Sequence, residues 1–120
     1  MPSRSDALKE RLSSHSEIRI SVTGRKSRRI VSIPVWFVLD GDNLYLLPVQ
    51  GSDTQWYKNV LNDPLIRVEV QGAEGAFKAM PITKASEVAS VAAKFRTKYG
   101  ASDVKKYYSK LDVAVLAQSR

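Results

Sequence analysis

The 120-residue sequence contains no cysteine and only one histidine, His15. The missing cysteines exclude disulfides, thiolate metal sites and a cysteine nucleophile. With a single histidine near the N-terminus, neither a serine–histidine triad nor a histidine-based metal site is expected. We therefore predict no catalytic side-chain set and no metal site. An enzyme with this sequence would rely on a bound cofactor, which the protein binds and orients.

Long apolar runs are also missing. No stretch approaches the roughly 18 apolar residues of a membrane span, and the polar N-terminus lacks the apolar region of a signal peptide. We therefore expect a soluble, cytoplasmic protein. A chain of this length is long enough to bury one core but not two, so residues 1–120 are predicted to form a single domain.

Charge is unbalanced: 19 lysines and arginines stand against 12 acids, a formal net charge of +7. The excess favours anionic ligands, nucleic acid or an anionic membrane surface. It gathers at Arg25–Arg29 and at residues 94–110, where Tyr99, Tyr107 and Tyr108 stand among lysines. These tyrosines fit a pocket mouth, a surface for single-stranded nucleic acid, or ordinary amphipathic helices. The residues alone leave the three interpretations open.

Apolar patterning predicts a mainly β fold with helices. Residues 17–22 alternate between polar and apolar, and the apolar run 30–39 predicts a strand covered on both faces. Tight turns and the absence of regular βαβ alternation favour an antiparallel barrel with helices packed outside. The six predicted strands cover residues 17–22, 30–39, 44–49, 66–70, 76–83 and 112–116. Asp40–Asn43 is predicted to form a hairpin turn, and Gly100 to cap the C-terminal end of a helix.

The N-terminal segment, residues 1–15, is predicted to be helical from about Ser3 to Ser14, with Ser5 as a cap. Leu8 and Leu12 lie four residues apart and give one narrow apolar stripe. The stripe could associate weakly with a membrane surface or a partner, but packing over the barrel is the favoured interpretation.

The stretch from Thr23 to Asn59 is the candidate binding element. Ser52 and Gln55 fit a capping box that opens a short helix, and the flexible Gly51 precedes it. A helix N-terminus attracts anions, and Arg25 and Lys26 could add charge-assisted hydrogen bonds. An ordinary capped helix beside a solvated basic turn has the same spacing, so spacing alone does not decide.

Pro34 lies inside a predicted strand, where it removes one hydrogen-bond donor from the ladder. It marks an edge strand, a bulge, or a wall against which a flat ligand rests. As a lone feature it favours the edge.

The order of these motifs resembles that of the deazaflavin-dependent nitroreductase family over about residues 18–116. The resemblance is carried by Thr23–Ser27, Pro34–Phe37, Asp40–Asp42, Gly51, Trp56–Asn59 and Asn62–Pro64. It implies an α+β fold built on a six-stranded antiparallel split β-barrel of the FMN-binding, pyridoxamine-phosphate-oxidase type. It also implies the reduced 8-hydroxy-5-deazaflavin coenzyme F(420), with hydride transfer to a quinone, nitro or unsaturated acceptor; relatives on this barrel use FMN.

The same resemblance implies roles for particular residues. Arg25 and Lys26 would meet the coenzyme's charged tail, Pro34 would lie along its rings, and Tyr107 or Tyr108 would stand at the substrate mouth. The implied cofactor-binding residues are Arg25, Lys26, Ser27, Ile33, Pro34, Pro48, Val49, Gln50, Gly51, Ser52, Thr54, Gln55 and Trp56. The implied substrate residues are Trp36, Tyr107 and Tyr108.

The chain departs from the family pattern after Ser27. Arg28, Ile30 and Val31 stand where the family has glycine, proline and arginine, so it stays open whether Arg28 or Arg29 replaces the arginine missing at Val31. The partners implied are a small-molecule hydride acceptor and a second copy of the chain, with no specific nucleic acid. The alternatives are an FMN-dependent reductase, a non-catalytic flavin carrier and, less favoured, a basic barrel that binds nucleic acid.

Overall fold

A computed structural model describes residues 8, 10–13 and 15–119 of the chain. Its strands are β1 (Ile18–Thr23), β2 (Ile30–Val35), β3 (Phe37–Asp40), β4 (Asn43–Leu46), β5 (Leu65–Val70), β6 (Ala73–Ile82) and β7 (Ala114–Ser119). Its helices are the short 3₁₀ helix η1 (Gly51–Asp53), α2 (Gln55–Asn62), α3 (Ala85–Tyr99) and α4 (Ala101–Tyr107). Residues 8 and 10–13 are also helical.

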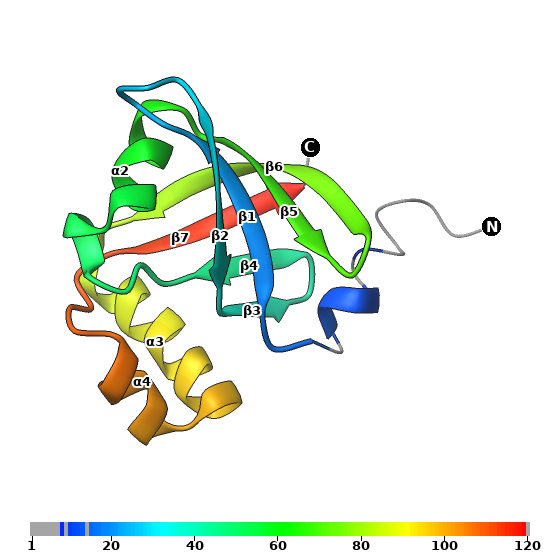
Figure 1. Cartoon of the computed structure of the whole chain (residues 1–120). Coiled ribbons are helices and arrows are strands. Elements are labelled where there is room, and N and C mark those ends of the chain that lie inside the picture. The colour runs from blue at the N-terminus through cyan, green and yellow to red at the C-terminus, as the bar shows by residue number, and fades with distance from the viewer. Residues whose placement is uncertain (1–7, 9, 14, 120) are drawn as a thin grey trace.

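The seven strands form one antiparallel sheet in the order β2-β1-β5-β6-β7-β4-β3. The sheet curls into a half-barrel, with α3 and α4 together on one side (Figure 1). The strands at its two ends, β2 and β3, are consecutive in the chain and separated only by Trp36. The chain itself therefore joins the two ends of the sheet at Trp36.

The prediction of six strands is wrong by one, because the run 30–39 is not a single strand. Its first part pairs with β1 and its second part pairs with β4, at opposite ends of the sheet order. One continuous strand cannot pair at both ends of the sheet, so the strand is interrupted at Trp36. The α+β class and the antiparallel arrangement are confirmed.

The prediction that this run is covered on both faces is also wrong for β2. Ile30 is 67% exposed and Val31 is 41% exposed. β2 ends the sheet order, so within the described chain only β1 pairs with it. The edge interpretation of Pro34 is therefore confirmed, and sheet edges are where strand prolines are usually found.

The core follows the alternation of the strands. Ile18, Ile20 and Val22 of β1 are buried, and β5 alternates in the same way. Leu8 and Leu12 also join this core, so the interpretation that the N-terminal stripe packs over the barrel is confirmed for these two residues. The predicted cap Ser5 lies outside the described residues.

A second apolar cluster lies under α3 and α4, comprising Leu47, Val91, Phe95, Val104, Tyr108 and Ala114.

Glycines mark the turns and helix ends. Gly41 has φ 63 in the predicted hairpin between β3 and β4, and Gly100 has φ 98 at the C-terminal end of α3, as predicted. The loop expected at residues 71–75 is shorter: Gln71 and Gly72 both have positive φ, typical of a two-residue type I′ turn. The last strand begins at Ala114 instead of Asp112.

Candidate functional site

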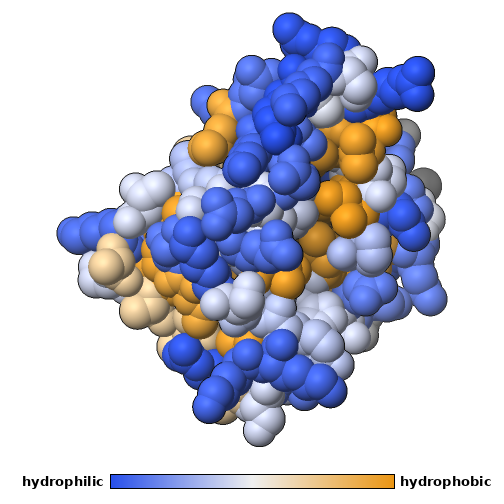
Figure 2. Space-filling model, turned by 60° about the vertical axis from the view of Figure 1, so that its left-hand side comes forward, coloured by the Kyte–Doolittle hydropathy of each residue, from blue (hydrophilic) through white to orange (hydrophobic). Residues whose placement is uncertain are grey.

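A pocket of about 340 Å³ opens between β2, the segment around η1 and α2, and the end of α4. We call it the aromatic pocket. Its lining is Glu17, Ile33, Pro34, Val35, Trp36, Leu47, Val49, Thr54, Trp56, Tyr107 and Tyr108. A mostly apolar and aromatic cleft of this size is typical of sites for small molecules and cofactors. On the face turned forward in Figure 2, apolar surface lies in hollows between hydrophilic side chains.

Trp36 is held in place by aromatic neighbours. Its ring stacks on Tyr99 at a centroid distance of 4.2 Å and an angle of 9°. Tyr107 approaches it edge-on at 5.4 Å, and Tyr108 lies at 6.1 Å. Such contacts stabilise aromatic pairs beyond simple burial. Trp36 therefore presents a fixed flat surface at the point where the chain turns from β2 to β3.

Tyr99 supports this corner through its hydroxyl group. The hydroxyl accepts a hydrogen bond from the Phe37 amide (3.0 Å) and lies 2.7 Å from the Ser16 carbonyl oxygen and 2.8 Å from that of Phe37. Burial, opposed by the Phe37 hydrogen bond and assisted by Glu17, raises the pKa of Tyr99 to about 12. The side chain is therefore a neutral anchor at physiological pH.

The pocket brings together half of the residues expected from the sequence. They are Ile33, Pro34, Trp36, Val49, Thr54, Trp56, Tyr107 and Tyr108. Five more do not line the pocket: Pro48, Gln50 and Gln55 directly adjoin lining residues in the chain, while Gly51 and Ser52 lie two positions from one. Arg25, Lys26 and Ser27 lie outside the lining, on the turn between β1 and β2.

Sequence reasoning missed Glu17, Val35 and Leu47. Val35 and Leu47 belong to apolar segments that were assigned to strands and the core. Glu17 carried no distinguishing signal, because it is simply the polar member of an alternating strand pattern. Tyr99 was considered with the other tyrosines, but nothing in the sequence shows that it stacks on Trp36.

The cationic turn between β1 and β2, residues 24–29, is anchored to α2 through Arg25. The Arg25 guanidinium donates to the Asn59 side-chain oxygen (2.8 Å) and to the Gln55 side-chain oxygen (2.8 Å), and its amide also donates to Asn59 (3.1 Å). Gln55 precedes the pocket residue Trp56. The turn is therefore fixed to α2, the helix that supplies Trp56 to the aromatic pocket.

The four cations of this turn lack acidic partners. Within the described chain, no carboxylate forms an ion pair with Arg25, Lys26, Arg28 or Arg29. Lys26, Arg28 and Arg29 are exposed, and Arg28 has φ 63. Clustered positive charge without internal compensation favours an external anion.

The segment 50–55 is not the predicted capped helix. Gly51–Asp53 is a 3₁₀ turn, and α2 begins at Gln55 with Thr54 as its N-cap, so the capping box at Ser52 is wrong. The Thr54 hydroxyl instead accepts a hydrogen bond from the Gln50 amide (2.8 Å). The packing partner of this turn comes from sixty residues away, which local sequence does not reveal.

That partner is Asp112. Its carboxylate accepts hydrogen bonds from the Ser52 amide (3.0 Å) and the Ser52 hydroxyl (2.6 Å). Gly51 is buried with φ 56, and a Cβ there would collide with Asp112 Oδ1. The Ser52 bonds, together with the nearby Lys110, hold the pKa of Asp112 below its ordinary value, although partial desolvation opposes them. The Ser52 amide therefore already meets an anion, one that belongs to the chain.

The part of the chain that the structure describes offers neither a cluster of metal ligands nor a membrane-spanning helix. No group of three or more histidine, cysteine, aspartate or glutamate side chains there could hold a metal ion. No helix among the same residues is long and apolar enough to cross a membrane.

Solved structures share this fold at low sequence identity. An F420-H2 dependent reductase, FDR-A, superposes with a TM-score of 0.68 at 16% identity, covering 87% of this chain and 95% of that one. The heme storage protein HutZ from Vibrio cholerae gives 0.72 at 13%, covering 95% and 88%. A protein provisionally described as a pyridoxamine 5′-phosphate oxidase from Listeria innocua gives 0.67 at 14%, covering 97% and 92%.

At these identities the likeness shows the fold alone, one that an F420-H2 dependent reductase and a heme storage protein have in common, and not a particular activity. The comparison with curated proteins finds no match. The match to a family model covers residues 9–115. The chain belongs to the family described as "Uncharacterized protein conserved in bacteria (DUF2255)".

Proposed function

We propose that this protein is an oxidoreductase that binds the reduced deazaflavin coenzyme F(420) in the aromatic pocket and passes hydride to a quinone, nitro or unsaturated small molecule. The observation that carries the proposal is the composition of this pocket. It joins Pro34, the predicted ring wall, to Trp36 and Tyr107, at the predicted substrate mouth. The barrel likeness to an F420-H2 dependent reductase supports the same assignment.

The pocket fits a flat, largely apolar ring system. Pro34 and Ile33 supply one wall, while Trp36 offers a ring surface fixed by Tyr99. A volume of about 340 Å³ leaves no room for a long charged tail, which would have to lie outside the pocket.

The cationic turn fits such a tail. Arg25 is fixed beside Trp56 through Gln55, and Lys26, Arg28 and Arg29 are exposed beyond it. Charge-assisted hydrogen bonds from these groups would hold a phosphate or carboxylate. In this proposal Arg28 or Arg29 supplies the cation that Val31 does not.

The turn at Gly51 and Ser52 fits a phosphate poorly. The Asp112 carboxylate already accepts from the Ser52 amide and would repel a second anion brought close to it. In the proposal Gly51 and Ser52 therefore adjoin an uncharged part of the coenzyme, and the charged tail is held by the β1–β2 turn.

The chain's own contribution to the reaction is binding and orientation. The coenzyme, when bound, supplies the hydride. The apolar walls exclude water, and Trp36, Tyr107 and Tyr108 confine the acceptor against the ring surface. Positioning two reactants in this way lowers the barrier without a side-chain acid or base.

Titration of the purified protein with the reduced deazaflavin and, separately, with FMN tests the proposal. We expect saturable deazaflavin binding with a Kd in the micromolar range, about −8 kcal/mol. Val49→Asp, which puts a carboxylate on the pocket lining, should abolish it. The matched control Leu61→Asp changes a similarly exposed apolar residue outside the pocket and should not.

Each other outcome has a definite meaning. No deazaflavin binding at micromolar concentration contradicts the proposal, and tight FMN binding instead would favour an FMN-dependent reductase. Binding without oxidation of the coenzyme by any quinone or nitro compound would favour a carrier. Binding of single-stranded nucleic acid that weakens steeply with salt would support the basic-barrel alternative.

A homodimer that covers β2 is part of the proposal. Ile30 and Val31 expose apolar side chains on an edge strand, the kind of surface that a second copy would cover. Light scattering should give twice the mass of one chain, and Ile30→Lys with Val31→Lys should give a monomer. A wild-type monomer at micromolar concentration would contradict this part.

A further inference from the structure

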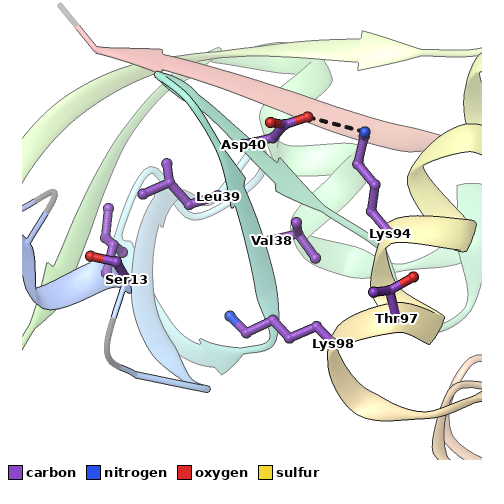
Figure 3. Close-up of a pocket in the computed structure, with 8 residues that line it drawn as sticks. Ser13, Val38, Leu39, Asp40, Lys94, Thr97 and Lys98 are labelled. Carbon is purple, nitrogen blue, oxygen red and sulfur yellow. Dashed lines mark hydrogen bonds and ion pairs between the residues drawn. The ribbon is translucent and has the colours of Figure 1, made fainter.

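A second pocket, of about 410 Å³, lies between β3, α3 and the N-terminal helical segment (Figure 3). We call it the lysine pocket. It shares no lining residue with the aromatic pocket. Its lining is Leu12, Ser13, Val38, Leu39, Asp40, Lys94, Thr97 and Lys98. The proposed coenzyme site makes no use of it.

The lining combines an apolar floor with a cationic side. Leu12 is buried, and Val38 and Leu39 of β3 are partly buried against the two apolar clusters. Lys94 and Lys98 reach into the pocket from one face of α3, four residues apart (Figure 3). An apolar floor beside a cationic rim suits a ligand that has an apolar body and an anionic head.

Lys98 is the unusual member. Its Nζ donates to the Phe37 carbonyl oxygen (2.9 Å) and the His15 carbonyl oxygen (3.3 Å), and it lies 3.6 Å from the centroid of the Phe37 ring. Within the described chain, no carboxylate pairs with it. Burial lowers the pKa of Lys98 from its ordinary value. An anion beside this ammonium would offset the cost of its partial desolvation.

Lys94 differs because it has an internal partner. Its Nζ lies 3.1 Å from Asp40 Oδ2, an interaction visible in Figure 3. Asp40 is the only acid among the described lining residues, which together carry one net positive charge. That excess charge resides on Lys98, whose Nζ lies 2.9 Å from the Phe37 carbonyl oxygen of β3.

We propose that the lysine pocket binds a small carboxylic acid with an apolar body, whose carboxylate meets Lys98 and whose body lies on Leu12, Val38 and Leu39. Two of the three ammonium protons of Lys98 are directed at carbonyl oxygens, so the third is the proposed donor to the carboxylate. The assignment is independent of the coenzyme proposed for the aromatic pocket.

Two-dimensional NMR of the full chain, titrated with octanoate and with benzoate, tests the assignment. We expect at least one of these acids to bind with a Kd of about 1 mM or below and to shift the amide signals of Val38, Leu39 and Thr97. The neutral amide of that acid, octanamide or benzamide, should bind about tenfold more weakly, because it lacks the charge-assisted contact. Binding of neither acid, or equal binding of acid and amide, would overturn the proposal.

Four variants separate Lys98 from general surface charge. Lys98→Met should weaken the acid about tenfold while Lys98→Arg retains binding, since only the second keeps the cation. Lys105→Met on α4 is the matched control for losing one positive charge and should have no effect. If Lys98→Met does not fold, Thr97→Glu at an exposed position of α3 replaces it, and its carboxylate should repel the acid. Unchanged binding in Thr97→Glu, or shifts confined to Trp56 and Tyr107, would refute the assignment.

Discussion

The β1–β2 turn and the 3₁₀ turn η1 both contact α2, but they differ in how their charged and polar groups are compensated within the chain. The β1–β2 turn carries four cations that meet no carboxylate within the described chain. In η1, by contrast, the Ser52 amide and hydroxyl both donate to the Asp112 carboxylate. One turn leaves its charge available to a ligand, while the other has its donors satisfied internally.

This difference shows what decides whether donors can serve as a ligand site. Glycine, serine and a helix start make an anion-attracting turn, but a folded chain can satisfy such a turn itself. Arg25 also has internal partners, yet they are the neutral amide oxygens of Asn59 and Gln55, which leave its positive charge uncompensated. In the proposed function, the anionic tail of the coenzyme is therefore placed at the β1–β2 turn.

Of the variants proposed, Gly51→Ala should have the largest effect, a loss of stability. Its backbone has φ 56, and a Cβ would collide with Asp112 Oδ1 and come within 2.9 Å of the Lys110 carbonyl oxygen. We expect the free energy of unfolding to fall by about 2–4 kcal/mol, the sum of backbone strain and overpacking. Urea denaturation measures it.

Gly72→Ala is the matched control. It also has a positive φ, but an added Cβ would meet open space, so only the backbone term of about 1 kcal/mol is expected. Equal losses in the two variants would mean that the close contact between η1 and Asp112 contributes little.

Most of the secondary structure followed from local pattern. The alternation at residues 17–22, the Gly41 turn and the Gly100 helix end all depend on nearest neighbours, and they are confirmed. The break at Trp36 was missed because it depends on which strands lie at the ends of the sheet. Periodicity shows that residues 30–39 are extended, but not that their two halves pair with different neighbours.

The same distinction between local pattern and long-range contact applies to the candidate site. The wall residues Pro34 and Trp36 meet Tyr107 in one pocket, which the family resemblance anticipates by position. The role of Asp112 could not be found, because its contact with Ser52 spans sixty residues and its own neighbourhood looks like the start of a strand. The lysine pocket was missed for the same reason, since three distant segments form it.

Arg25→Ala tests whether the β1–β2 turn holds the anionic tail of the proposed coenzyme. If Arg25 meets the anionic tail, deazaflavin binding should weaken by about 1–3 kcal/mol, the range for a hydrogen bond to a charged group. Asn59→Ala removes the acceptor that holds Arg25 but keeps the cation, so it should affect stability more than affinity. Calorimetric titration and urea denaturation of both variants separate the two effects. Unchanged affinity in Arg25→Ala would remove Arg25 from the site.

Asp112→Asn tests the contact between η1 and Asp112 through the pH dependence of the free energy of unfolding. The folded-state pKa of Asp112 lies below its ordinary value of 3.8, so its carboxylate stabilises the fold at neutral pH. That contribution should be lost as the pH falls from the ordinary value through the lower folded-state value. Because the group is exposed, we expect a loss of at most about 1 kcal/mol at pH 7. The difference between the urea midpoints of wild type and variant should shrink as the pH falls below 3.8, and a constant difference would contradict this account.

Lys26→Ala should give the smallest effect. Lys26 is exposed, so its contribution to the binding of an anionic tail is expected to be below about 1 kcal/mol and to fade as salt screens it. Lys78→Ala, an exposed lysine of β6, controls for the loss of net charge. Deazaflavin titrations at low and high salt should show weaker binding of Lys26→Ala only at low salt. If the two variants bind alike at low salt, net charge attracts the tail and Lys26 makes no specific contact, which would leave Arg25, Arg28 and Arg29 as the cations that hold it.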